Sequence, residues 1–148
     1  MQTQQTTLKP RQGFTLVELA VVVVIIGVLA AFGVPRFLMS VERSKAAEAF
    51  AYLSAVRNAQ ERFHAREGIY SDTLTDLDIQ APTPKYFNPG PITGNPDLEL
   101  SWTMTLTRIG PSAGYENYEV TFNEEGYDAI NSTISAEINP VGGFSGGT

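Results

Sequence analysis

Two acidic positions and one histidine are the residues in this sequence that could support chemistry. Glu18 lies inside an otherwise uncharged apolar run, residues 14–34. A carboxylate costs about 2.5–3.5 kcal/mol at the centre of a bilayer and less near an interface, so Glu18 needs a cationic partner. His64 is the only histidine. The sequence places no acid and nucleophile to complete a catalytic set with it, so we expect a packing role and no enzymatic activity.

The second acidic feature of the sequence is a cluster of three carboxylates near a predicted turn. Glu124, Glu125 and Asp128 are close enough in sequence to suggest calcium, because clustered carboxylates can bind this ion. They do not form an alternating Asp-x-Asp-x-Asp series. We therefore expect a solvated turn and no cofactor, with calcium as the less favoured alternative.

The apolar run has the length of a membrane span. Its 21 residues would form a helix of about 31 Å, which matches a hydrocarbon core of about 30 Å. Lys9 and Arg11 precede it and favour a cytoplasmic N-terminus, with the remaining chain on the other side. An ordinary single-span anchor would also have this length, but it would leave Glu18 without a role.

The residues around Gly13 resemble the leader and cleavage site of type IV prepilins and pseudopilins. The resemblance rests on the stretch Arg11-Gln12-Gly13-Phe14-Thr15-Leu16-Val17-Glu18-Leu19. In that family a prepilin peptidase cuts after the glycine and methylates the new amine. The resemblance thus implies cleavage between Gly13 and Phe14, N-methylation of Phe14, and an assembly role for Glu18, the fifth mature residue. In that role the Glu18 carboxylate would pair with the Phe14 amine of a neighbouring subunit, and a pair within one subunit is the alternative.

The apolar run continues into a longer helix, the stem. Phe50, Leu53, Val56 and Phe63 recur at helical spacing, which predicts helix over residues 14–67 and an end at Gly68. Gly33 and Pro35 lie inside this helix, where proline removes a hydrogen bond and clashes with the preceding turn. We therefore expect a helix break there, as a kink or a melted stretch.

Residues 68–96 contain five prolines and are predicted to be a surface connection, which the resemblance equates with the αβ-loop of pilins. A short helical turn is expected around Leu74, Leu77 and Ile79.

Alternating polarity then predicts antiparallel strands. Residues 98–109 place apolar side chains on one face, namely Leu98, Leu100, Trp102, Met104 and Leu106. Residues 115–123 are expected to pair with them as a hairpin, and a third strand is expected within residues 127–138. The glycine-rich residues 141–148 are predicted to be a loose tail.

Composition limits the function further. The chain has 148 residues, no cysteine and a net charge of −6. It departs from the many type IVa pilins that close the C-terminal region with a disulfide. Residues 68–148 contain eleven acids against two bases, whereas residues 36–67 sum to +2. A basic stem and an acidic head suit lateral contacts between subunits, and the head offers no basic patch for nucleic acid.

The expected fold is α+β, with a long N-terminal helix packed on a small antiparallel sheet. Its parts are a leader (1–13), the helix (14–67, with 14–34 in the membrane or the filament core) and a globular head (68–148). The resemblance implies a type IV pilus subunit that forms a helical homo-oligomer. It also implies three further partners, namely the membrane, prepilin peptidase and an inner-membrane assembly platform. Before assembly the head would be periplasmic; afterwards the protein would be in an extracellular pilus or a periplasmic pseudopilus. The alternatives are the major pseudopilin of a type II secretion system and a monomeric membrane-anchored binding domain.

Overall fold

The computed structural model describes residues 13–94, 96–112 and 114–142. Contacts divide the chain into two units, Met1–Arg36 and Phe37–Thr148. The helical stem belongs to both units, because helix α1 runs over Leu16–Glu67. The second unit therefore contains the last part of the helix as well as the residues after it.

Helix α1 ends where the sequence predicts. Gly68 has a φ of 80° and its amide donates to the carbonyl of His64 at 2.8 Å. A left-handed residue at this position is a common way to close a helix. The helix assignment continues through Gly33 and Pro35, so this stretch is not melted in the single chain, and a break there in the assembled filament stays a prediction. Proline removes only one hydrogen bond, and the turns on both sides keep the helical conformation.

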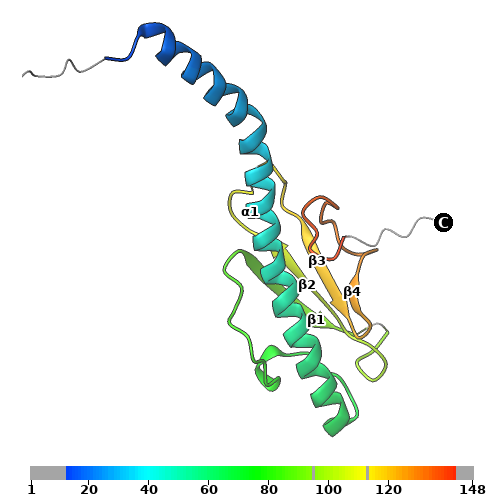
Figure 1. Ribbon diagram of the computed structural model, residues 1–148. Coiled ribbons are helices and arrows are strands. Elements are labelled where there is room, and N and C mark those ends of the chain that lie inside the picture. Colours follow the sequence, from blue (N-terminus) through cyan, green and yellow to red (C-terminus); the bar gives the residue numbers. More distant parts are fainter. Residues whose placement is uncertain (1–12, 95, 113, 143–148) are drawn as a thin grey trace, which may run out of the picture. The chain divides into compact units, whose positions relative to one another are not determined.

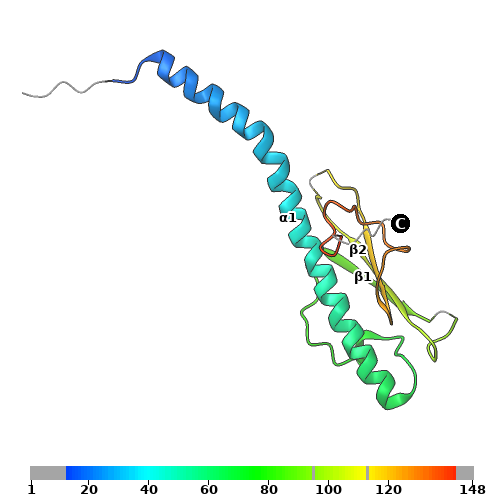
Figure 2. The ribbon, with the colours of Figure 1, turned by 45° about the vertical axis from the view of Figure 1, so that its right-hand side comes forward.

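The second unit contains one antiparallel sheet. Its strands are β1 (Phe87–Thr93), β2 (Thr103–Arg108), β3 (Glu119–Asn123) and β4 (Gly126–Asp128), in the order β1-β2-β3-β4. Residues 37–67 of α1 lie across one face of this sheet (Figures 1 and 2). The α+β prediction, a long helix on a small antiparallel sheet, is confirmed.

Strand β1 corrects the prediction of a loop throughout residues 68–96. It contains Pro89 and Pro91, and its pairing with β2 shifts register between Pro89 and Ile92. Proline is tolerated because β1 is an edge strand, where one side of the backbone needs no partner in the sheet. Gly90 permits close pairing, since an added Cβ would lie 2.9 Å from the carbonyl oxygen of Thr105. The short helical turn is confirmed as a 3-10 helix, η1 (Leu74–Asp76).

The strand predicted over residues 98–109 begins later than expected. Residues before Trp102 form a turn in which the Asp97 carboxylate accepts hydrogen bonds from the amides of Glu99 and Leu100. Leu100 is consequently 67% exposed, although alternation assigned it to the buried face. The side chain of Asp97 competes with the sheet for these amides.

The predicted core of the head is otherwise confirmed. A stripe of α1 that includes Ala46, Ala49, Leu53 and Val56 is buried together with strand residues, among them Trp102, Met104, Leu106 and Val120. Full burial of a large aliphatic side chain contributes about 1.5–3 kcal/mol. The third strand, β4, overlaps the start of its predicted range and begins one residue before it, at Gly126, whose φ is 123°.

Candidate functional site

The chain is open around the expected processing site. An added Cβ at Gly13 would meet no atom within 4 Å among the residues described, and Phe14 is 85% exposed. Contacts among the described residues therefore give no reason for glycine at position 13, and cleavage after Gly13 stays a prediction. Residues 1–12 of the expected leader, with Lys9 and Arg11, lie outside the described residues.

Glu18 has a local role that the sequence prediction missed. Its Oε2 accepts hydrogen bonds from the amide and from the hydroxyl of Thr15, both at 2.9 Å, and its own amide donates to Thr15 Oγ1 at 3.2 Å. Since α1 begins at Leu16, Thr15 and Glu18 form a reciprocal capping box at the helix start. The signal was the Thr-x-x-Glu spacing itself. Pairing of Glu18 with the amine of a neighbouring subunit stays a prediction.

Around Glu18, the first part of α1 displays apolar side chains on all sides. It is long and apolar enough to cross a membrane, with a mean hydropathy of 2.8 over an 18-residue window of which nothing is buried. The large exposed side chains include Leu19, Val23, Ile26 and Leu29. A surface of this kind is stable only when lipid or other protein covers it.

A buried ion pair is the main feature that the sequence analysis did not find. Arg108 Nε lies 2.6 Å from Glu42 Oε1 and Arg108 Nη2 lies 3.2 Å from Glu42 Oε2, a two-pronged contact. The side chains are 1% and 0% exposed. The pair joins helix α1 to the end of strand β2, and two-pronged contacts of this kind fix geometry as well as charge.

Further groups complete the shell of this pair. The Tyr118 hydroxyl donates to Glu42 Oε1 at 3.1 Å, and Lys45 Nζ donates to Glu42 Oε2 at 3.2 Å. The guanidinium also donates to the carbonyls of Tyr86, Ile109 and Pro111. Both charges are thus fully hydrogen-bonded, the condition under which a buried ion pair is tolerated.

The network controls how Glu42 titrates. Burial by itself would raise the pKa of Glu42, but hydrogen bonds from Arg108 and Lys45 outweigh it and hold the pKa below its usual value. Burial and the negative charge of Glu42 raise the pKa of Tyr118 far above its usual range. The carboxylate is therefore charged, and the phenol neutral, at physiological pH.

The three carboxylates considered for calcium do not converge. No group of three or more His, Cys, Asp or Glu side chains that could hold a metal ion occurs within residues 13–94, 96–112 and 114–142. Asp128 instead organises the loop after β4, where its carboxylate accepts from the amides of Ile130 and Asn131 and from the side chain of Asn131. The hydrogen bond from the Asn131 side chain holds the pKa of Asp128 below its usual value.

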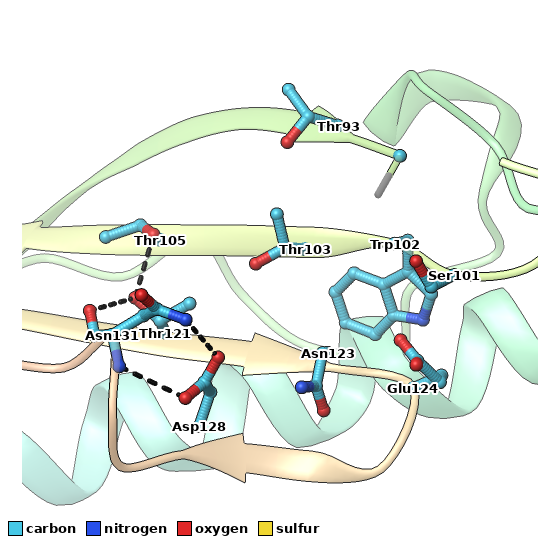
Figure 3. Close-up of a pocket in the computed structure, with 11 residues that line it drawn as sticks. Thr93, Ser101, Trp102, Thr103, Thr105, Thr121, Asn123, Glu124, Asp128 and Asn131 are labelled. Atoms are coloured by element: carbon cyan, nitrogen blue, oxygen red, sulfur yellow. Dashed lines mark hydrogen bonds between the residues drawn. The ribbon is translucent and has the colours of Figure 1, made fainter. Parts of the chain in front are cut away.

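A polar pocket of about 560 Å³ lies on the sheet (Figure 3). Its lining includes Thr93, Thr103, Asn123, Glu124 and Asp128, together with a Thr105–Thr121 hydroxyl pair 2.8 Å apart. Trp102 is fully buried, as predicted, and its indole nitrogen and Glu124 Oε2 have no hydrogen-bond partner among the described residues. His64 stacks on Tyr70 with ring centroids 4.3 Å apart, so it packs as expected.

Comparison with known proteins identifies the family. Residues 8–34 match the family described as the prokaryotic N-terminal methylation motif. A fimbrial protein of Pseudomonas aeruginosa is 41% identical over 128 residues, which cover 86% of this chain and 70% of that protein. The chain belongs to the type IV pilin and pseudopilin family.

Both branches of the pilin and pseudopilin family are represented among its relatives. The type IV major pilin protein PilA of Myxococcus xanthus is 44% identical over 66 residues, which cover 45% of this chain and 30% of that protein. The type II secretion system core protein G of Vibrio cholerae is 36% identical over 84 residues, which cover 57% of this chain and 56% of that protein. The chain therefore spans less than two thirds of the length of these two relatives.

Proposed function

We propose that this chain is a non-enzymatic structural subunit that polymerises into a type IV pilus filament. The observation that carries the proposal is the apolar first part of α1, which has no buried residue in its own chain although its N-terminus matches a methylation motif. The same apolar surface can be covered by lipid before assembly and by neighbouring helices afterwards.

Processing would prepare the subunit for assembly. Prepilin peptidase would cut between Gly13 and Phe14, and N-methylation would leave Phe14 with a cationic amine at neutral pH. Removal of Lys9 and Arg11 would change the formal charge from −6 to −8. Before assembly the helix would cross the inner membrane with its N-terminus in the cytoplasm, and an assembly platform would add subunits to a filament outside.

Two measurements test this function. Mass spectrometry of the native protein should find methylated Phe14 as the N-terminus, and electron microscopy should find filaments that contain the chain. Replacing Gly13 with leucine should leave uncut precursor in the membrane, while Gly13→Ala, a smaller change, serves as the control. An intact leader in native filaments, or a cut beyond residue 34, would refute the processing step.

The pseudopilin of a type II secretion system is a second candidate, favoured by the similarity to the Vibrio cholerae protein. Its filaments would be periplasmic, so deletion of the chain should abolish secretion of a folded exoprotein and leave surface pili unchanged. Loss of surface pili with normal secretion supports the pilus subunit. A monomeric membrane-anchored domain would instead retain residues 1–13 and form no filaments.

A further inference from the structure

A pocket of about 390 Å³ lies beside the start of β1 and the end of β2. Its walls are formed by Tyr86, Ile109, Gly110 and Pro111, together with the side chains of the nearby bases, Lys45, Lys85 and Arg108. Ile109 and Pro111 are exposed at its mouth. The pocket is thus largely apolar, with cations around it.

The basic side chains of the head, residues 68–148, lie at this pocket. Lys85 and Arg108 are the only two bases in residues 68–148, and both line it. With Lys45 they surround the Tyr86 ring at 5.3–5.6 Å from its centroid. Glu42 and Glu48 offset two of these charges, because Glu42 pairs with both Arg108 and Lys45 and Glu48 accepts from the amides of Lys85 and Tyr86.

An exposed apolar side chain of the same head, Ile130, could act as a knob that fills such a pocket. Ile130 is 93% exposed, the largest value among the large hydrophobic residues that the structure describes. The loop that presents it is held by Asp128, which accepts from the amide of Ile130 at 3.0 Å and from the side chain of Asn131 at 2.7 Å. A loop already ordered in this way loses little entropy on docking.

Charge also favours a contact between the Ile130 loop and the pocket. Residues 109–148 contain six acids and no base, so the chain segment that carries Ile130 is acidic, while Arg43 and Arg57 of α1 donate to the carbonyls of Pro140 and Glu124 beside it. The pocket has a net charge of +1 when the five neighbouring charges are counted. Acidic and basic surfaces attract one another and orient the encounter of two subunits.

Sheet order keeps the knob and the pocket of one head apart. The pocket adjoins β1 and Ile130 follows β4, and these strands are the two opposite edges of the sheet. A contact between the two must therefore join two copies. Such a head-to-tail contact leaves one knob and one pocket free on every growing chain of subunits, which is the condition for open polymers.

We propose that Ile130 of one subunit inserts into the Tyr86–Ile109–Pro111 pocket of a second copy of this chain. The inference rests on the proposed filament function and adds a specific contact between heads. Apolar burial supplies the attraction and the surrounding Lys45 and Lys85 select the acidic partner surface. The contact is directional, so it would link subunits in series.

Introduced cysteines test the contact without interference, because the chain has no cysteine of its own. Filaments of the double variant Ile130→Cys/Ile109→Cys, treated with a mild oxidant or a short bis-maleimide, should give a ladder of covalent multimers. Filaments assembled from a mixture of the two single variants should stop at dimers. The control pair Ile130→Cys/Leu100→Cys should give no ladder, since Leu100 does not line the pocket.

A second variant keeps the test decisive if the cysteines impair assembly. Ile130→Glu should weaken subunit addition about tenfold or more, because it removes one buried apolar side chain and adds a charge. Leu100→Glu, at another exposed leucine, should assemble normally. Normal filament yield from Ile130→Glu, or filaments of the double cysteine variant without a ladder, would overturn the contact. Failure of the unchanged chain to form filaments would instead refute the proposed function.

Discussion

A buried guanidinium and a buried carboxylate can stabilise a fold only while each is the counter-charge of the other. Glu42 and Arg108 are both buried, and Tyr118 and Lys45 add hydrogen bonds to the carboxylate. The chain has no cysteine and therefore no disulfide. This hydrogen-bonded network links the helix to the sheet instead. Its value therefore lies in fixing one register between α1 and β2.

Glu42→Gln should destabilise the head by about 3–5 kcal/mol, because it leaves the buried Arg108 without a counter-charge. The pKa of Glu42 is lowered in the folded chain. Its contribution is therefore present above the unfolded pKa of about 4.3 and is lost as pH falls through the folded value. Denaturant unfolding between pH 7 and pH 3 should show this loss in the unchanged chain and a smaller pH slope in the variant.

The control for this experiment is Glu116→Gln, at an exposed acid. It should change the free energy of unfolding by less than about 0.5 kcal/mol. Equal stability of Glu42→Gln and Glu116→Gln would contradict the role assigned to the buried pair.

Glu18 combines a cap in the single chain with a predicted charge pair in the filament, and two substitutions separate them. Glu18→Gln keeps an oxygen that can accept from Thr15 but removes the charge, whereas Glu18→Ala removes both. We expect both variants to be cleaved at Gly13 and to fail to form filaments of normal length, because the amine of a neighbouring Phe14 loses its partner. Filament length by electron microscopy and the N-terminus by mass spectrometry check this.

The two Glu18 variants distinguish the capping role from the assembly role. Normal filaments from Glu18→Gln but not from Glu18→Ala would assign Glu18 to capping alone. Normal filaments from Glu18→Ala would leave it with no role in assembly.

Single residues were predictable where a motif marked them. Gly13 and Glu18 belong to one contiguous motif, but no motif joins Glu42 to Arg108, which lies 66 positions further along the chain. A signal was nevertheless present. Glu42 continues the buried stripe of α1 one turn before Ala46, and Arg108 has the same parity as Leu106 on β2, so both positions face the core.

At the scale of elements, the region around Gly33 and Pro35 is helical in the single chain, and the filament is where its predicted melting would occur. Pro35 lacks the amide that closes a helical turn, so this turn is the weakest in α1. We expect a filament density map to show a kinked or melted stretch there. Pro35→Ala should restore straight helix, with Gly27→Ala as the control. A straight, unbroken helix in filaments of the unchanged chain would contradict the prediction.

The elements follow from local patterns except where side chains override them. Helical spacing and Gly68 predicted the end of α1, and alternation predicted β2 and β3. The start of β2 was wrong because Asp97 binds the amides of Glu99 and Leu100. Strand β1 was missed because two prolines normally argue against a strand, and only its place at the sheet edge makes them acceptable.

At the scale of the whole molecule, the described core residues all lie within the second unit. Buried side chains begin at Glu42 and reach Asn139, and the unit begins at Phe37. We therefore expect a fragment of residues 37–148 to be a soluble, cooperatively unfolding domain. Circular dichroism and thermal unfolding would measure this. A fragment that begins at residue 47 and lacks Glu42 should be markedly less stable, and equal stability of the two fragments would contradict the prediction.

Hydropathy predicted both the head and the apolar anchor, because it is summed over many residues. The candidate processing site was predicted from contiguous residues. The pocket at Tyr86 was not, because Lys45, Tyr86 and Ile109 come together only through tertiary packing.

The position of Glu42 has a mechanical consequence. It is the first buried residue of α1 counted from the N-terminus, so tension applied along the helix reaches the sheet first at Glu42. The two hydrogen bonds from Arg108 to Glu42, together with those from Tyr118 and Lys45, would share this load. We expect Glu42→Gln to lower the rupture force of the head when the chain is pulled between its helix and its C-terminus. An unchanged force would show that the load passes into the apolar core instead.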